Sequence, residues 1–366
     1  MPLLSIGFNN FRNLENRILD LYHSEIFLVG KNGQGKTNLL EAIYLIAYGN
    51  SFRTRKDSEL CKIGTDEYGL TALFKENDNI SHNIFVSLKE KKTGTKTTKV
   101  KEIKKNLKKV IDRKELVNTI PCVLFFHDDI EFAKGNMEKR RFFLDQTLSM
   151  NNSEYIDTLR KFNKILKTRN IILKEKKENL LDSIDIQFAT VGIQIKEQRQ
   201  KVIESFNELF SELYQKISGI ENIKIAYRPM WNENTVDEIL VHLLERRQKD
   251  LDIGITMTGP QRDKIHFLKD KKPFTLIAST GQLRLLSLVL RTVQAHYYKK
   301  TSKRKPILLL DDVLLELDPE KKIKFIELLP EYDQLFCTFL PGELYMNYAK
   351  KDTHIYLVEN GDFLNE

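Results

Sequence analysis

Apolar and polar residues alternate in short runs over the first part of the chain. Residues 4–8, 17–21 and 83–88 place apolar side chains at about every second position, a period that predicts β-strands. The runs 25–29 and 120–126 are almost entirely apolar, which is typical of strands buried on both faces of a sheet. We therefore expect the first 125 residues to be rich in strands.

From Met137 onward the apolar residues recur at steps of three and four, the period of an α-helix. The pattern predicts one long helix from about Ser153 to Lys177 and another from about Leu181 to Ile217. The steps in the second helix approach a heptad repeat, so the two helices suit an antiparallel arm. An ordinary packed helical subdomain fits the same pattern, and the sequence does not separate the two.

After residue 250 strand-like and helix-like segments return. We expect a helix over residues 281–298 and buried strands at 306–310 and 334–339. The chain therefore predicts an α/β fold that is split in sequence by a helical insertion. The expected boundaries are residues 1–136 for the first segment, 137–250 for the α-helical lobe and 251–366 for the second segment.

A glycine-rich stretch lies between the predicted strand at 25–29 and an apolar helix over 38–48. It fits the phosphate-binding P-loop pattern G-x-x-x-x-G-K-[ST], in which backbone amides and a helix N-terminus surround phosphate oxygens. Lys36 is expected to reach the β- and γ-phosphates of ATP, and Thr37 to ligate Mg²⁺. The predicted ATP-binding residues of this loop are Gly30, Lys31, Asn32, Gly33, Gln34, Gly35, Lys36 and Thr37.

The apolar run 307–310 ends in two carboxylates, Asp311 and Asp312. This is the Walker B pattern, in which an aspartate at the end of a core strand reaches Mg²⁺. We expect Asp311 to share the metal ion with Thr37, and Asp312 to polarise the attacking water. A buried strand that simply ends in a turn is the alternative. Lys36 completes the predicted catalytic set.

About 30 residues before the Walker B pattern, Ser279, Gly281 and Gln282 form an S-x-G-Q sequence at the start of a predicted helix. The order of P-loop, helical insertion, S-x-G-Q and Walker B resembles the ABC-type ATPase head. That resemblance implies that the serine and the helix N-terminus contact the γ-phosphate of ATP held by a second copy. Residues 316–318 match the D-loop of the same family, which adds Asp318 to the implied ATP site of a homodimer.

Within this class the chain resembles the RecF family of bacterial recombinational-repair ATPases. The matching segments are residues 10–13, 38–44, 51–54, 138–145, 258–263, 279–284 and 308–318. The resemblance implies ATP-driven dimerisation on duplex or gapped DNA, weak DNA-dependent ATP hydrolysis, and recombinase loading together with RecO and RecR. It also implies that Arg53 lies near the γ-phosphate or DNA. The alternative is that Arg53 is an ordinary surface arginine. Gln261 and Leu283 depart from the family pattern, which has histidine and glutamine there.

The net charge of +8 is concentrated in one segment. Residues 89–114 contain twelve lysines and arginines and three acidic residues, whereas the rest of the chain is almost neutral. Such an excess suits a polyanion such as DNA, although a solvated lysine-rich loop has the same composition. The predicted DNA-binding residues are Lys96, Lys99, Lys101, Lys104, Lys105, Lys108 and Lys109.

Composition restricts the remaining functional classes. No apolar run approaches the roughly 20 residues that a membrane helix needs, and the first residues lack the pattern of a signal peptide. The three cysteines are widely spaced, as expected for free thiols in the cytoplasm, where the resemblance implies association with the nucleoid. No histidine follows the strand at 334–339, which disfavours a transporter subunit. The alternatives are a structural DNA-binding protein with an uncoupled nucleotide site and an ATPase subunit of another assembly.

Overall fold

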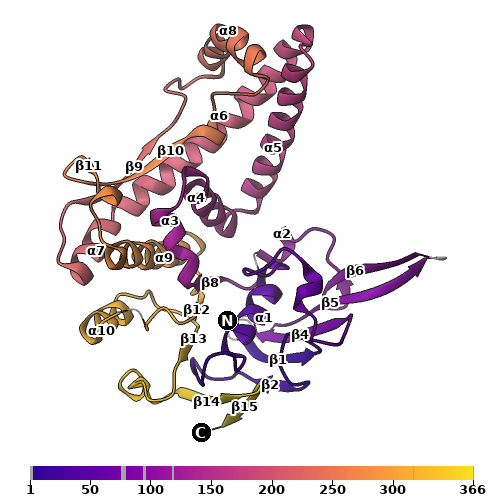
Figure 1. The fold of residues 1–366 in the computed structure, drawn as a ribbon, viewed down its shortest axis with the longest axis vertical. Helices are drawn as coiled ribbons and strands as arrows, with labels where there is room; N and C mark the ends of the chain where they lie inside the picture. The colour runs from indigo at the N-terminus through magenta and orange to yellow at the C-terminus, as the bar shows by residue number, and fades with distance from the viewer. Residues whose placement is uncertain (1–2, 76–79, 94–95, 118, 316, 366) are drawn as a thin grey trace. The chain divides into compact units, whose positions relative to one another are not determined.

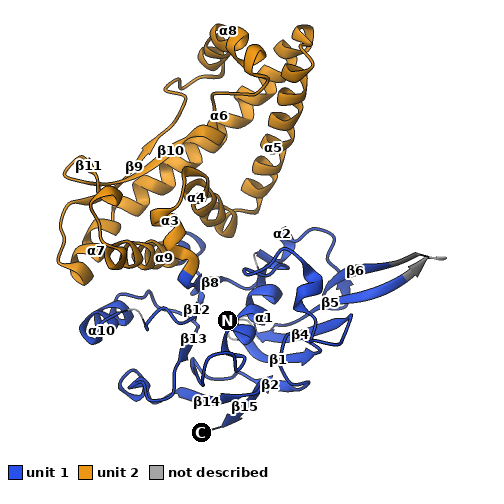
Figure 2. Cartoon of the chain, viewed as in Figure 1, with its two compact units in different colours: residues 1–127, 298–366 blue, residues 128–297 orange. Residues whose placement is uncertain are grey.

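The computed structural model describes residues 3–75, 80–93, 96–117, 119–315 and 317–365 (Figure 1). The chain forms two compact units: unit 1 contains residues 1–127 and 298–366, and unit 2 contains residues 128–297 (Figure 2). The observed boundaries differ from the expected ones, because residues 251–297 belong to the helical unit and not to the second ATPase segment.

Unit 1 contains a six-stranded, mostly parallel sheet with the order β15-β14-β3-β13-β12-β8. Its strands are β3 (Glu25–Val29), β8 (Cys122–Phe125), β12 (Ile307–Leu310), β13 (Gln334–Phe339), β14 (Thr353–Glu359) and β15 (Asp362–Asn365). The first four are buried at every position, which explains their continuous apolar sequences. Since β3, β12 and β13 are parallel, the segments that follow them leave the sheet at the same edge.

The second sheet of unit 1 is antiparallel, with the order β2-β1-β4-β5-β6-β7. Its strands are β1 (Leu3–Asn9), β2 (Ile18–Asp20), β4 (Tyr68–Lys75), β5 (Ser81–Thr93), β6 (Lys96–Lys105) and β7 (Lys108–Lys109). Side chains alternate between a core face and an outer face, most regularly along β4. The β5–β6 hairpin continues beyond the neighbouring strands (Figure 1).

Helix α1 (Lys36–Tyr48) packs against strands of both sheets and joins them into one core. Leu39, Leu40 and Ile43 are almost completely buried, and each contributes roughly 2 kcal/mol of hydrophobic stabilisation. The helix ends at Gly49, whose positive φ of 69° suits glycine. Shorter elements of unit 1 are η1 (Asp57–Leu60), α2 (Lys114–Val117), α10 (Pro319–Glu327) and η6 (Tyr345–Asn347), and η2 (His127–Asp129) spans the boundary.

Unit 2 is mainly helical. Its elements are α3 (Ile130–Lys134), α4 (Met137–Asn151), α5 (Ser153–Lys174), η3 (Glu178–Leu180), α6 (Leu181–Asn207), α7 (Phe210–Ser218), β9 (Ile223–Arg228), α8 (Val236–Ile253), η4 (Pro260–Arg262), β10 (Lys264–Lys269), β11 (Lys272–Pro273), η5 (Phe274–Leu276) and most of α9 (Thr280–Ser302). Helix α8 packs against both α5 and α6, and β9 packs against α6. Within unit 2 the α5–α6 pair is therefore packed.

Two features explain where the expected organisation was wrong. β10 pairs with β9 along its whole length, and Arg291 of α9 binds Asp129, so the segment after residue 250 joins unit 2. The expected helix over 181–217 is two helices, because Asn207 exchanges two hydrogen bonds with the backbone of Ile225 and the chain leaves the helix there. No helix of the described residues is long and apolar enough to cross a membrane.

Candidate nucleotide-binding site

The P-loop connects β3 to α1 at the edge where the parallel strands end. Gly33 and Gly35 have φ values of 79° and 122°, which residues with a side chain rarely adopt. A Cβ atom on Gly30 would lie 2.4 Å from the carbonyl oxygen of Val358 in β14. Glycine is thus required at the loop for two different reasons, backbone conformation and close packing.

Lys36 folds back into the loop that precedes it. Its Nζ donates hydrogen bonds to the carbonyl oxygens of Gly30 at 2.5 Å and Lys31 at 3.1 Å. The residue is only 4% exposed, and burial lowers its pKa despite the nearby carboxylates of Asp312 and Asp311. Lys36 has no ion-pair partner within 4 Å in the described part of the chain. A buried ammonium in this position would be stabilised by an anion bound inside the loop.

Thr37 and Asp311 meet at the same edge. The Thr37 hydroxyl donates to Asp311 Oδ1 at 2.9 Å, although the two residues are 274 positions apart. Burial, together with the Asp312 carboxylate, raises the pKa of Asp311 to about 7. A hydroxyl and a carboxylate are oxygen ligands of the kind that Mg²⁺ uses beside nucleotide phosphates. In the described ranges no three His, Cys, Asp or Glu side chains form a metal site of their own.

Asp312 is oriented by the neighbouring strand. Its backbone amide donates to Thr338 Oγ1 at 2.7 Å, and that hydroxyl donates to Asp312 Oδ1 at 2.9 Å. Asp312 also has a φ of 54°, unusual for a residue with a side chain. Thr338 thus fixes the carboxylate that the sequence assigns to the attacking water.

Two asparagines from other segments, Asn13 and Asn360, hold the loop, and Asn38 of α1 holds Asn13. Asn13 donates to the carbonyl of Gly33 at 3.0 Å and accepts a bond from Asn38 at 2.6 Å. The amide of Asn360 donates to the Gln34 side chain at 2.6 Å. No sequence motif assigns a role to these asparagines. Asn13 and Asn38 fall in segments that match the family, which is the one signal that marks them.

Arg53 lies beside α1. It donates to Asn38 Oδ1 at 2.8 Å and to Glu41 Oε2 at 3.3 Å. Glu41 is completely buried and also accepts two hydrogen bonds of 2.8 Å from Arg12. The Ser51 hydroxyl adds a third partner at 2.5 Å. The family resemblance implies a site role for Arg53, whereas no pattern in the sequence marks Glu41, the carboxylate that orients it.

The S-x-G-Q residues begin α9 in unit 2. Ser279 and Gln282 form a reciprocal helix cap: the Ser279 amide donates to Gln282 Oε1 at 2.8 Å, and the Gln282 amide donates to Ser279 Oγ at 3.3 Å. Ser279 and Gly281 are exposed. Asp318 caps α10 in unit 1 by accepting the Lys321 amide at 3.0 Å. Its D-loop neighbour Glu316 lies outside the described residues.

The predicted DNA-binding lysines fall into two groups. Four of them already contact acceptors: Lys99 binds Asp66 at 2.6 Å, Lys101 binds Asp57 at 2.5 Å, Lys104 binds Glu102 at 3.2 Å and Lys105 binds Thr119 at 2.8 Å. Lys108 and Lys109 are exposed and form no ion pair with a described residue. The Lys96 side chain lies outside the described part. The segment therefore presents less free positive charge than its composition indicates.

A P-loop and a Walker B aspartate meet at one edge of a sheet whose strands come from two segments of the sequence. This architecture defines an ABC-type ATPase head. A family model described as the RecF/RecN/SMC N terminal domain matches residues 2–362. An Smc head structure with 14% sequence identity and a TM-score of 0.58 shares the fold. The chain belongs to the RecF family, and the predicted fold class is confirmed.

Relatives of known name support the assignment over the whole chain. The DNA replication and repair protein RecF of Treponema pallidum is 47% identical over 354 residues, which cover 96% of this chain and 98% of the relative. The RecF protein of Leptospira interrogans is 32% identical over 99% of this chain and 98% of its own. A solved structure of the recombination mediator protein RecF with ATP has a TM-score of 0.85 and 28% identity, and covers all of this chain and 97% of that one.

Proposed function

We propose that this protein is an ATP-dependent DNA-binding protein of recombinational repair and replication restart. The observation that carries the proposal is the buried Lys36 ammonium, which lies inside a glycine loop next to the Thr37–Asp311 pair. The names of the relatives and the ATP in the similar RecF structure support the same function.

The residues of the loop bind and orient the nucleotide. Lys36 and the backbone amides of residues 30–37 would hold the phosphates, and Thr37 and Asp311 would hold Mg²⁺. Bound there, Mg²⁺ would neutralise negative charge on the phosphate oxygens. Asp312, fixed by Thr338, orients the water for hydrolysis. The short aspartate side chain, where many ATPases have glutamate, is consistent with weak DNA-dependent ATP hydrolysis.

ATP binding drives homodimerisation in this proposal. Ser279 and Gly281 are exposed at the start of a long helix, so the helix N-terminus is available to the γ-phosphate of ATP held by a second copy. Gln282 keeps that helix start in place through its bond to Ser279. Arg53 and Asp318 lie near the nucleotide in the dimer.

Ser279→Arg is expected to abolish ATP-dependent dimerisation while the monomer still binds nucleotide. An ATP-induced dimer of this variant in sedimentation velocity would contradict the contact between Ser279 and the ATP of the second copy.

DNA binding uses the β5–β6 hairpin and its lysines. Contacts to phosphates make binding sensitive to salt and largely independent of sequence. The substrates are duplex and gapped DNA, and the partners are RecR and RecO. The protein acts in the cytoplasm, in association with the nucleoid.

Sedimentation velocity with a fluorescent duplex tests the coupling of ATP to DNA. With Mg·ATP we expect a dimer that sediments with the duplex, and with Mg·ADP a monomer that binds it less. If the protein stays monomeric and binds the duplex equally well without nucleotide, the nucleotide site is not coupled to DNA. A structural DNA-binding protein would then be the better description.

A further inference from the structure

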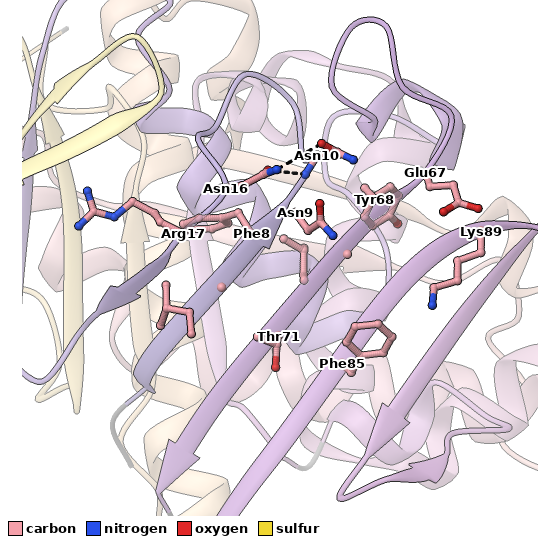
Figure 3. Close-up of a pocket in the computed structure, with 14 residues that line it drawn as sticks. Phe8, Asn9, Asn10, Asn16, Arg17, Glu67, Tyr68, Thr71, Phe85 and Lys89 are labelled. Atoms are coloured by element: carbon pink, nitrogen blue, oxygen red, sulfur yellow. Dashed lines mark hydrogen bonds between the residues drawn. The ribbon is translucent and has the colours of Figure 1, made fainter.

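The outer face of the antiparallel sheet contains a hollow of about 670 Å³ (Figure 3). Gly7 of β1 and Gly69 of β4 line it, and Thr71, Phe85 and Lys89 project from β4 and β5 around it. Residues of the opposite face, such as those on either side of Gly69, are buried in the core. The hollow is therefore open to solvent on one side only and has a floor of backbone.

The glycine at position 69 is not required by the fold. No positive φ occurs at Gly69, so any residue can adopt its backbone conformation. A Cβ atom there would have its nearest neighbours, in Asn9 and Phe85, at 3.8 Å, an ordinary van der Waals distance. Gly7 differs, since its Cβ would lie 2.8 Å from the Thr71 methyl group. Because strands disfavour glycine, the open space over Gly69 points to something that binds there.

The side chains around the hollow suit a nucleotide. The half-exposed Phe85 ring offers an aromatic face, and the Lys89 ammonium lies over that ring, 6.0 Å from its centre, on a long side chain that can move aside for a base. Lys89 is exposed and has no ion-pair partner in the described ranges. The other charged residues of the hollow are already engaged. Arg17 at the far side is paired with Asp362, and Glu67 accepts a hydrogen bond from the Glu90 amide. An aromatic face beside a free cation is the combination that binds single-stranded nucleic acid by stacking and by phosphate contact.

An unpaired base fits this chemistry better than a duplex does. Inside a duplex both faces of each base are covered by neighbouring bases, so away from the duplex ends the Phe85 ring can stack only on a base that has left the helix. The hollow is also continuous with the basic hairpin, because Lys89 and Lys91 follow one another on the outer face of β5 as the strand continues into the hairpin.

We propose that this hollow binds an unpaired nucleotide of DNA next to duplex held by the β5–β6 hairpin. The inference rests on the proposed DNA-binding function and specifies how a junction between single-stranded and double-stranded DNA is distinguished from plain duplex. Phe85 stacks on the base, Lys89 contacts the adjacent phosphate, and the Asn9 carboxamide lies within the same hollow. None of these residues belongs to the nucleotide-binding edge described above.

Fluorescence anisotropy in the presence of Mg·ATP tests the proposal with a blunt duplex and with the same duplex carrying a single-stranded tail. The wild-type protein is expected to bind the tailed duplex about tenfold more tightly. Gly69→Val fills the hollow, and Phe85→Leu removes the aromatic face but keeps an apolar side chain. Both variants should lose the preference for the tail and retain the affinity for blunt duplex. Lys75→Gln removes a charge from the same sheet face outside the hollow and should keep the preference.

The outcomes separate this inference from the proposed function. If the variants melt like wild type and still prefer the tailed duplex, or if wild type shows no preference, the hollow does not bind an unpaired nucleotide. If wild type binds neither substrate, the proposed DNA-binding function fails as well. Because Phe85→Leu and Gly69→Val alter the hollow in different ways, loss of the preference in both supports the assignment even if one variant is less stable.

Discussion

The P-loop edge and the basic strands β6 and β7 of unit 1 both contain lysines, but in opposite environments. At the edge, Lys36 is 4% exposed and two backbone carbonyls fix its ammonium. On β7, which pairs with β6 of the hairpin, Lys108 and Lys109 are exposed and form no ion pair with described residues.

The difference in burial decides how much one residue contributes. A charge interaction is several times stronger in a partly buried site than in water, where salt also screens it. At the edge a single substitution is therefore expected to remove function. On β6 and β7 each lysine contributes less, so a single substitution there is expected to weaken binding without abolishing it.

Lys36→Arg is expected to have the largest effect. The planar guanidinium is bulkier than an ammonium and does not fit the position between the Gly30 and Lys31 carbonyls. ATP turnover in the presence of DNA should fall by about a hundredfold or more, while the thermal midpoint changes little. Lys75→Arg, the same change at an exposed position, is the control. Normal turnover by Lys36→Arg would refute the role of Lys36 in catalysis.

The nucleotide-binding edge could be predicted in part, because each of its two motifs is a short, continuous stretch of sequence. The P-loop pattern and the Walker B run each specify a strand end, and parallel strands bring Thr37 and Asp311 to the same edge. Asn360 reaches the loop from a segment more than 300 residues away, and no local pattern marks it. The strands β14 and β15 that carry this contact were likewise not predicted.

For the fold and the basic strands, the sequence predicted which regions are helical, strand-rich or basic but not their detailed contacts. Composition identifies the basic segment, whereas the alternation of side chains along β6 determines which lysines can reach an acidic partner. Lys99 and Lys101 share the face of Ile103, where Asp66 and Asp57 meet them. The unit boundary was wrong because the pairing of β9 with β10 is long-range, and such pairing leaves no trace in helical periodicity.

The pH dependence of stability tests how deeply the edge is buried. The pKa of Asp311 is raised from its ordinary value of 3.8 to about 7, so the folded chain holds this proton more tightly than the unfolded chain. The stabilisation is complete below about pH 4 and is lost as the pH rises through about 7. Without nucleotide and Mg²⁺, wild type should lose on the order of 1–4 kcal/mol between pH 5 and pH 8 relative to Asp311→Asn.

Thermal denaturation across this pH range measures the difference, with Asp318→Asn as the control. The bonds from Lys321 lower the pKa of Asp318, so its contribution is present throughout the range and changes only in more acidic solution. Asp318→Asn should therefore keep the wild-type slope. If Asp311→Asn also keeps that slope, Asp311 is charged in the nucleotide-free protein and the edge is more hydrated than the structure indicates.

The smallest effect is expected on strands β6 and β7, where paired and free lysines can be compared directly. Lys108→Gln with Lys109→Gln removes two free charges, and Lys99→Gln with Lys101→Gln removes two that Asp66 and Asp57 already offset. The free pair should weaken duplex binding severalfold and reduce the slope of log affinity against log salt by about two, one for each phosphate contact. The paired double variant should change both quantities less, because the Asp66 and Asp57 carboxylates already hold these two ammonium groups and leave them less available to phosphates. Anisotropy titrations over a range of KCl concentrations compare the two. If the slope falls as much in the paired variant as in the free one, the aspartates release their lysines when DNA binds. All the lysines of the segment then contribute to phosphate binding.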